Sequence, residues 1–389
     1  MLMYESVDYY QLTNLFSEEE KLVQKTARRF VEEKFIPIIT AYHRKGEFPL
    51  EMVKQLGELG FLGPTIPEKY GGAGLNNMCY GLIMQELERG DSGLRSFASV
   101  QGGLVIYPIY TFGSEKQKTT WLPLLISGEK IGCFGLTESD HGSNPAGMKT
   151  TAQKISGGYR ITGSKMWITN GSLADIAIVW AKLDNTIRGF LIEKGTPGFQ
   201  ANTIKGKFSL RASDTAELVF DECDIPEENI LPGSGGLKSP LQCLNQARYS
   251  IAWGSVGAAM ACYDAALKYA INRIQFDRPV AAYQLTQEKL VYMVTEITKA
   301  QLLNYHLAKL KDEKTMKPAH VSMAKRNNAE QSLRIARMAR SILGANGISD
   351  EYPVIRHMLN LETVLTYEGT HEIHTLIIGE EITGIAAYY

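Results

Sequence analysis

The sequence predicts a mainly α-helical protein with a central β domain, because its apolar pattern changes character twice along 389 residues. Residues 1–130 combine helix start signals with helical apolar spacing. Residues 131–235 hold short β-prone runs between glycine, proline and asparagine turns. Residues 236–389 return to long helical periodicity, which is typical of a helical bundle. We therefore expect an N-terminal helical domain, an antiparallel β domain and a C-terminal helical bundle, divided at these positions.

Local signals place the individual elements. Ser17 and Ser114 each precede a Glu or Gln by three residues, which is a capping-box pattern. Pro49 stands near the start of another helix, and Gly60 is suited to end it. Four runs in the middle region are β-prone: 161–163, 176–181, 189–192 and 218–220. Three long helices are expected in the last region: 237–275, 284–313 and 317–343.

Composition excludes several classes of function. Lys plus Arg is 41 and Asp plus Glu is 42, so the net charge of −1 provides no electrostatic footprint for nucleic acid or an anionic membrane. The five cysteines lack CxxC spacing and predict buried thiols, neither disulfides nor a zinc site. Residues 1–6 do not begin a secretory signal, and no run is long enough to span a bilayer. A cytoplasmic protein, or a mature mitochondrial matrix form, is expected.

Several motifs are set aside. No GxGxxG follows a strand, and the glycine spacing at 158–164 lacks the lysine of a phosphate-binding loop. His371 and His374 are three residues apart but have no convincing partner ligands, so no metal is expected. An arginine stripe on one helix, at positions 334, 337 and 340, predicts a solvated or subunit-facing surface.

Glu368 lies in the run Tyr367-Glu368-Gly369-Thr370, which we expect to form a glycine-flexed turn between two helical stretches. A carboxylate suits the removal of a weakly acidic proton beside a thioester, provided that an apolar pocket raises its pKa toward neutrality. The alternative is a solvated loop carboxylate. The segments below favour the base.

The run from Leu365 to His374 resembles the catalytic-base segment of the acyl-CoA dehydrogenase family, and the resemblance covers nearly the whole chain. It implies the fold of that family: an N-terminal α domain, an antiparallel β domain and a C-terminal four-helix bundle. It also implies FAD, a homotetramer and an electron-transfer flavoprotein as partner. Glu368 would remove the α-proton of an acyl-CoA thioester while the β-hydride passes to the flavin.

Two segments are similar to the flavin-binding segments of the family. The first runs from Cys133 to Ser143 and supplies Phe134, Leu136, Thr137 and Ser143, although Ser139 and Asn144 replace the usual Pro and Asp. Taken alone, this run would be a simple turn. The second contains Trp167 and Thr169, where an indole would face the isoalloxazine ring. Its alternative is a core tryptophan on a strand.

Further cofactor contacts are implied near the C-terminus. Arg273, Phe276 and Gln284 resemble the element that reaches FAD in a neighbouring subunit, with Asp277 in place of the usual Gly. The resemblance also assigns FAD contacts to Gly344, Gly347 and Thr370, with Ala345 replacing another usual Gly.

The runs around Arg95, 207–213, 347–352 and 382–385 are most similar to the glutaryl-CoA dehydrogenases of this family. Arg95 would pair with the terminal carboxylate of glutaryl-CoA. Glu88 is two helical turns earlier and is expected on the same helix face. The other substrate-binding residues implied are Ser99, Ser143, Arg248 and Tyr367. The resemblance implies oxidation of glutaryl-CoA and decarboxylation to crotonyl-CoA.

Other interpretations remain open. One alternative is that Arg95 is a surface or capping arginine, which would leave a short-chain acyl-CoA dehydrogenase or acyl-CoA oxidase acting on monocarboxylic substrates. A catalytically silent flavin-containing scaffold or a nucleic-acid-associated relative is a further alternative, against which the retained Glu368 and balanced charge argue.

Overall fold

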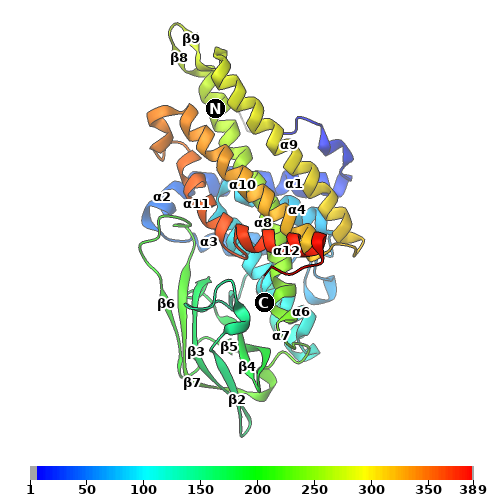
Figure 1. Ribbon diagram of the computed structural model, residues 1–389. Helices are drawn as coiled ribbons and strands as arrows, with labels where there is room; N and C mark the ends of the chain where they lie inside the picture. The colour runs from blue at the N-terminus through cyan, green and yellow to red at the C-terminus, as the bar shows by residue number, and fades with distance from the viewer. Residues whose placement is uncertain (1–6, 388–389) are drawn as a thin grey trace.

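The computed structural model describes residues 7–387 and shows two helical regions around a β-sheet. Figure 1 places the sheet at one end of the molecule and the long helices of the C-terminal region at the other. The prediction about residues 1–6 concerns a segment outside the described range. Within that range, no helix combines the length and apolar character needed to cross a membrane.

The N-terminal region is helical as predicted. Its helices are α1 (Glu18–Phe30), α2 (Ile36–Lys45), α3 (Glu51–Glu58), α4 (Asn77–Gly90), α5 (Ser92–Ser99), α6 (Tyr107–Phe112) and α7 (Glu115–Ile126), with π-helical turns at Val31–Phe35 and Val100–Ile106. Both predicted capping boxes are present, at Ser17 and Ser114. Gly60, with a φ of +72°, follows α3 where the Phe61 amide donates back to the Leu56 carbonyl. Gly60 therefore ends α3 as expected.

The middle region forms a seven-stranded sheet, and every predicted β-prone run falls within a strand. The strands are β1 (Gly132–Gly135), β2 (Thr151–Ile155), β3 (Gly158–Thr169), β4 (Ile176–Leu183), β5 (Thr186–Glu193), β6 (Phe199–Thr203) and β7 (Thr215–Pro226). The order is β1-β4-β2-β3-β7-β6, with β5 pairing β4. Most pairs are antiparallel, but β4 runs parallel to β1 and β2. Parallel pairs need a long connection, and the β2–β3 hairpin lies between β1 and β4 in the chain.

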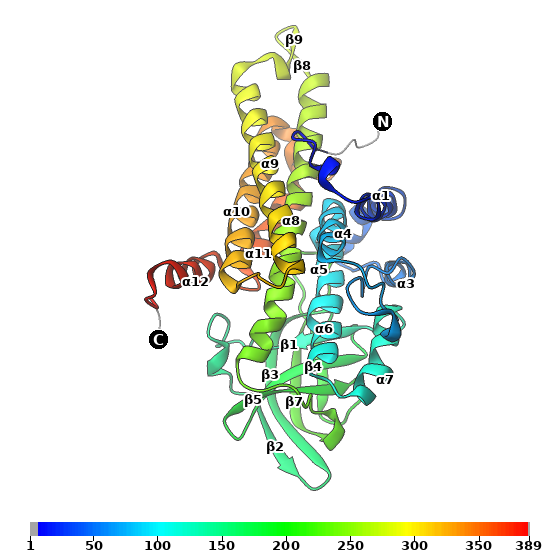
Figure 2. The same cartoon turned by 90° about the vertical axis from the view of Figure 1, so that its right-hand side faces the viewer.

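The three C-terminal helices with predicted limits begin and end within a few residues of them, and two shorter helices follow. They are α8 (Lys238–Asn272), α9 (Gln284–Asp312), α10 (Pro318–Ile342), α11 (Val354–Thr366) and α12 (His371–Thr383), with a hairpin of β8 (Ile274–Gln275) and β9 (Arg278–Pro279) after α8. Figure 2 shows α12 projecting from the bundle on the side away from α1. The predicted turn around Glu368 joins α11 to α12.

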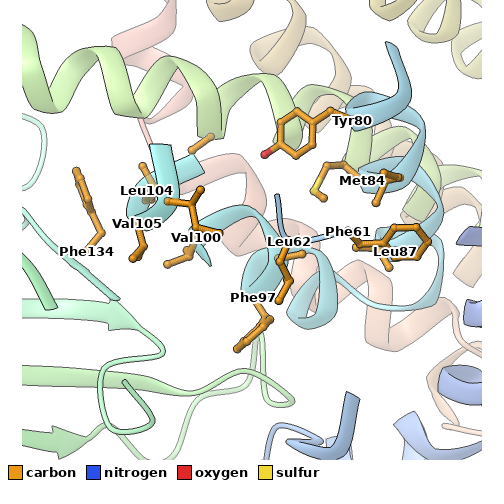
Figure 3. Close-up of a cluster of buried hydrophobic side chains, with 14 of the residues drawn as sticks. Phe61, Leu62, Tyr80, Met84, Leu87, Phe97, Val100, Leu104, Val105 and Phe134 are labelled. Atoms are coloured by element: carbon orange, nitrogen blue, oxygen red, sulfur yellow. The ribbon is translucent and has the colours of Figure 1, made fainter. Parts of the chain in front are cut away.

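One buried cluster connects the N-terminal helices, α8 and the sheet. Figure 3 shows part of it, in which Tyr80 and Met84 from α4 lie with Val100 and Leu104 from the segment after α5, and Phe134 from β1 lies at the end of the group. Close approach of α4 to α8 depends on glycine, because a Cβ at Gly257 would lie 1.9 Å from a carbonyl oxygen of α4. This packing fixes α4 and α5 beside the turn that follows α11.

Candidate active site

Glu368 lies in a tight turn that requires an unusual backbone conformation. Its φ is +53°, and the φ of Gly369 is +102°. The left-handed region is unfavourable for a side-chain-bearing residue by about 1–2 kcal/mol, so the surroundings must hold this turn. Thr370 then caps α12, because its hydroxyl oxygen accepts a hydrogen bond from the amide of Ile373 at 3.3 Å.

The carboxyl group of Glu368 is held in a poorly hydrated place. Its Oε2 atom is buried and has no hydrogen-bond partner within residues 7–387. Burial raises the pKa of Glu368 to about 7, although the charges of Arg95, Arg248 and Lys325 act in the opposite direction. A carboxylate with a pKa near neutrality can both take a proton and return it at physiological pH.

Arg95 lies fully buried beside this turn, which excludes the surface-arginine alternative. Its Nε donates to Glu88 Oε2 at 2.6 Å, its Nη1 donates to Ser99 Oγ at 3.1 Å, and its Nη2 donates to the Tyr367 hydroxyl oxygen. Within the described chain these bonds use one N–H from each nitrogen. Two of the five guanidinium N–H groups therefore remain for a ligand carboxylate.

The expectation that Glu88 and Arg95 share one helix is wrong. Helix α4 ends at Gly90, and α5 begins at Ser92. Asp91 between them is extended, with φ −168° and ψ 145°, and its side chain caps α5 by accepting from the Gly93 amide. The buried Asp91 carboxylate also accepts from Arg356 and Asn360 of α11, so a long-range contact stabilises the break.

Tyr80 is a further residue of the site, which the sequence analysis missed. Its hydroxyl is buried and faces the side chain of Ser250 on α8. Burial raises the pKa of Tyr80, and the charges of Arg95 and Glu368 also act on it. Tyr80 precedes Glu88 by eight residues on α4, so the helical spacing of these two polar positions was the available signal.

Arg248, which was expected to contact substrate, donates two hydrogen bonds beside the turn of Glu368. The Nε atom of Arg248 donates to the carbonyl oxygen of Glu368 at 3.0 Å, and its Nη1 donates to Asn245 Oδ1 at 3.1 Å. The structure therefore places Arg248 on the backbone of the turn. Its predicted contact with substrate stays a prediction.

The two predicted flavin segments lie side by side. The amide of Met166 donates to the carbonyl of Thr137 at 2.8 Å, which brings Thr137 next to Trp167 and Thr169. Trp167 sits at a register shift of β3, has a φ of +63° and is 61% exposed. The alternative of a core tryptophan is therefore wrong. A flat indole is therefore presented at the surface, next in the chain to the residue that pairs with Thr137.

A buried ion pair between Lys165 and Glu138 stabilises the first predicted flavin segment. Lys165 donates to Glu138 Oε1 at 2.8 Å and to the carbonyl of Leu136 at 3.2 Å. Although burial raises the pKa of Glu138, hydrogen bonds from Lys149, Lys165 and Thr150 outweigh it and lower the pKa to about 2. Phe134 and Leu136 are buried, whereas Ser143 is exposed on the following loop.

The third group of predicted cofactor residues lies far from Glu368 in the same chain. Arg273, Phe276 and Gln284 surround the β8–β9 hairpin, which both cartoon views place at the opposite end of the molecule from the sheet. Phe276 is 90% exposed. Asp277 adopts a φ of +62°, so the turn keeps the left-handed form that favours glycine.

The glycine loop after α10 is tightly packed. Gly344 has a φ of +60°, and a Cβ at Gly347 would lie 2.3 Å from the carbonyl oxygen of Arg340. Position 347 therefore requires glycine, and the backbone conformation at position 344 favours it. His371 and His374 join no group of three or more metal-binding side chains in the described part of the chain.

The carboxyl group of Glu368, with its pKa near neutrality, is suited to remove a weakly acidic proton such as the α-proton of a thioester. Family models agree: the acyl-CoA dehydrogenase N-terminal, middle and C-terminal domains match residues 17–129, 133–223 and 234–383. The chain belongs to the acyl-CoA dehydrogenase family. It is an FAD-dependent enzyme. The exposed indole of Trp167 offers a flat apolar face that fits a flavin ring, and the flavin contacts of Thr137 and Thr169 stay predictions.

Relatives within the family point to two substrate classes. A solved glutaryl-CoA dehydrogenase from Mycobacterium smegmatis is 51% identical, with a TM-score of 0.97 over 99% of this chain and 100% of its own. Another solved glutaryl-CoA dehydrogenase from that organism, in complex with FADH2, is 48% identical, with a TM-score of 0.97 over 98% and 99% of the two chains. The mitochondrial short-chain specific acyl-CoA dehydrogenase of Rattus norvegicus is 36% identical over 95% of this chain and 91% of its own.

Proposed function

We propose that the protein oxidises glutaryl-CoA and decarboxylates the product, releasing CO2 and crotonyl-CoA. The observation that carries this proposal is Arg95, a fully buried guanidinium with donors to spare beside the Glu368 turn. A purely apolar acyl chain could not pair with the guanidinium, and burying a guanidinium is unfavourable unless it is paired. A five-carbon diacid thioester would bring its terminal carboxylate to Arg95.

Glu368 is the base in this reaction. Its carboxylate takes the α-proton of the thioester. FAD, when bound, would supply the oxidant for the β-hydride, so that the substrate loses two hydrogens and gains a C=C bond. The bond to the terminal carboxyl group then breaks and CO2 leaves, with its electron pair retained on the carbon chain. Glu368, now protonated, returns a proton to that chain, for which a pKa of about 7 is well suited.

Glu88 and Tyr367 would weaken the binding of the substrate's terminal carboxylate by Arg95. Glu88 lies 2.6 Å from the guanidinium and neutralises part of its charge, while the Tyr367 hydroxyl occupies a second nitrogen. The terminal carboxylate must be oriented yet able to leave as CO2. A guanidinium without these partners would bind the carboxylate more strongly and oppose its loss.

The alternative is an enzyme for short monocarboxylic acyl-CoA thioesters. The same ion pair favours it, because Arg95 already has a carboxylate partner inside the protein. In that case the pair is structural and the acyl chain ends before it.

The test supplies glutaryl-CoA and an artificial electron acceptor to the purified enzyme. Reduced acceptor, CO2 and crotonyl-CoA in equal amounts are expected, with the product identified by mass. Glutaconyl-CoA as the sole product, without CO2, would mean that the enzyme only oxidises. Turnover of butyryl-CoA with none of glutaryl-CoA would establish the monocarboxylic alternative.

We also propose an electron-transfer flavoprotein as the acceptor and a homotetramer as the assembly. The β8–β9 hairpin, which follows Arg273 and includes Phe276 in its turn, lies at the opposite end of the chain from β3, the strand that contains Trp167. A second chain would bring this hairpin to the flavin site, which agrees with the 90% exposure of Phe276. Sedimentation of the purified protein measures the number of chains.

A further inference from the structure

Buried cations from two helices bind the backbone of the turn that carries Glu368. Lys325 of α10 donates to the carbonyl oxygen of Leu365 at 3.1 Å and to that of Gly369 at 2.9 Å. Arg248 of α8 donates to the carbonyl oxygen of Glu368 itself. Lys325 therefore contacts the chain on both sides of the base and Arg248 contacts it in the middle.

The local structure explains why such contacts are needed. Leu365 lies in the last turn of α11, where helix carbonyls lack intrahelical partners. Gly369 then bends the chain into α12, and Lys325 joins these two points with one fully buried amine. The left-handed φ of Glu368 is unfavourable by itself, so its orientation depends on what holds the carbonyls around it.

His374 closes the turn from the side of α12. Its ring is fully buried, and a Cβ added to Gly369 would lie 2.8 Å from its Nε2 atom. Space and backbone conformation both exclude other residues at position 369. The turn is thus enclosed by α8, α10 and α12, and Lys325 is its central contact.

We propose that Lys325 is a positioning residue, which holds the carbonyls of Leu365 and Gly369 so that the Glu368 carboxylate points at the substrate. This inference rests on the proposed role of Glu368 as base. It concerns the orientation of the base and holds for any acyl-CoA thioester that the enzyme oxidises.

The charge of Lys325 provides a readout that a purely structural lysine would not give. Burial lowers the pKa of Lys325 to about 7, and the charge of Glu368 opposes this shift. Arg248 and Arg95 also face the amine, from α8 and α5, and Glu372 faces it from α12. Because a positive Lys325 lowers the pKa of Glu368, removing it must raise that pKa.

The protonation state of Lys325 separates its hydrogen bonds to the turn from its electrostatic influence on the pKa of Glu368. A neutral amine keeps two N–H groups and can still donate to both carbonyls, whereas its charge is lost. At pH 9 the wild-type enzyme therefore retains the contacts without the charge. A loss of activity at pH 9 on substitution of Lys325 therefore measures its positioning role. The pH at which kcat/KM falls on the acid side of its pH profile, the acid limb, measures the influence of its charge on Glu368.

The experiment compares Lys325→Met, Lys325→Gln and a matched control. Methionine has no donor, and glutamine has an amide that reaches one carbonyl, so activity should fall in the order wild type, Gln, Met. At pH 9 and saturating butyryl-CoA we expect kcat of the Met variant to fall by roughly 10- to 100-fold, the size of effect seen for small misplacements of reacting groups. The KM for butyryl-CoA and the FAD content should stay close to wild type.

Lys311→Met is the control. Lys311 lies on α9, donates to Gln246 and also has its pKa lowered to about 7 by burial, but does not contact the turn. Its kcat and acid limb should match wild type. In both Lys325 variants the acid limb of kcat/KM should move to higher pH.

The outcomes separate this inference from the proposed function. Unchanged kcat at pH 9 in Lys325→Met would overturn the positioning role, whether or not the acid limb of kcat/KM moves. Failure of both Lys325 variants to fold, while Lys311→Met folds, would overturn it by showing a structural role alone. If wild type oxidises butyryl-CoA but releases no CO2 from glutaryl-CoA, the proposed function fails and the Lys325 comparison is still decided on butyryl-CoA.

Discussion

Substitution of Arg95 is the most direct test of substrate class, and the structure determines how it must be done. Arg95 and Glu88 are both fully buried and lie 2.6 Å apart. Removing the guanidinium alone leaves an uncompensated buried carboxylate, which typically destabilises a protein by about 3–5 kcal/mol. Native stabilities are roughly 5–15 kcal/mol, so Arg95→Met by itself could fail to fold.

The variant of choice is therefore Glu88→Gln/Arg95→Met, with Glu88→Gln alone as its reference. A desolvated, hydrogen-bonded charge pair between protein and ligand contributes about 2–5 kcal/mol when one partner is removed. The selectivity for glutaryl-CoA over butyryl-CoA, as a ratio of kcat/KM, should fall by roughly 30- to 5,000-fold in the double variant. The assay follows reduction of an artificial acceptor by each thioester.

Arg89→Met is the matched control, because Arg89 is another buried arginine of the same region, paired with Glu86 at 2.9 Å. It should lower stability without changing the preference between the two thioesters. Equal losses on glutaryl-CoA and butyryl-CoA in the double variant would refute the reasoning. Arg95 would then be structural, and the monocarboxylic alternative would lead.

Four further predictions concern the base and the cofactor. Glu368→Gln should lower turnover by about 10²- to 10⁴-fold with little change in FAD content, and near-wild-type turnover would place the base elsewhere. Since only the carboxylate accepts a proton, kcat/KM should rise about tenfold per pH unit below pH 7 and level off above it; a flat profile between pH 5 and 8 would contradict the pKa of about 7. The raised pKa means that the native state binds more protons than the unfolded chain between pH 4.5 and about 7, so Glu368→Gln should raise the melting temperature more at pH 8 than at pH 5. Purified protein should be yellow, and a colourless protein that FAD cannot reconstitute would contradict the whole interpretation.

The sequence by itself determined the elements whose signals are local. Capping boxes at Ser17 and Ser114, the glycine stop at Gly60 and the β-prone runs of the middle region are all found where they were predicted. These signals act within one helical turn or one strand, so neighbouring residues are sufficient. The turn at Glu368 belongs to this group, because two helical patterns and a glycine define it.

The tertiary structure decided how distant residues meet. Arg95 and Tyr367 are separated by 272 positions in the chain, and only the packing of α5 against the turn after α11 brings them into contact. The break between α4 and α5 follows from the same cause, because Asp91 is held by Arg356 and Asn360 of α11. The parallel pairs of β4 and the exposure of Trp167 likewise depend on partners elsewhere in the sheet.

The contacts of Lys325 and Arg248 in the site could not be predicted from the sequence either. In the sequence each is one more charged residue of a long helix. No local pattern reveals that its side chain donates a hydrogen bond to a carbonyl oxygen of the turn that carries Glu368. Burial gives these charges their effect, because electrostatic interactions strengthen as water is excluded. The sequence therefore determines which residue can act as the base, and the fold determines its pKa and orientation.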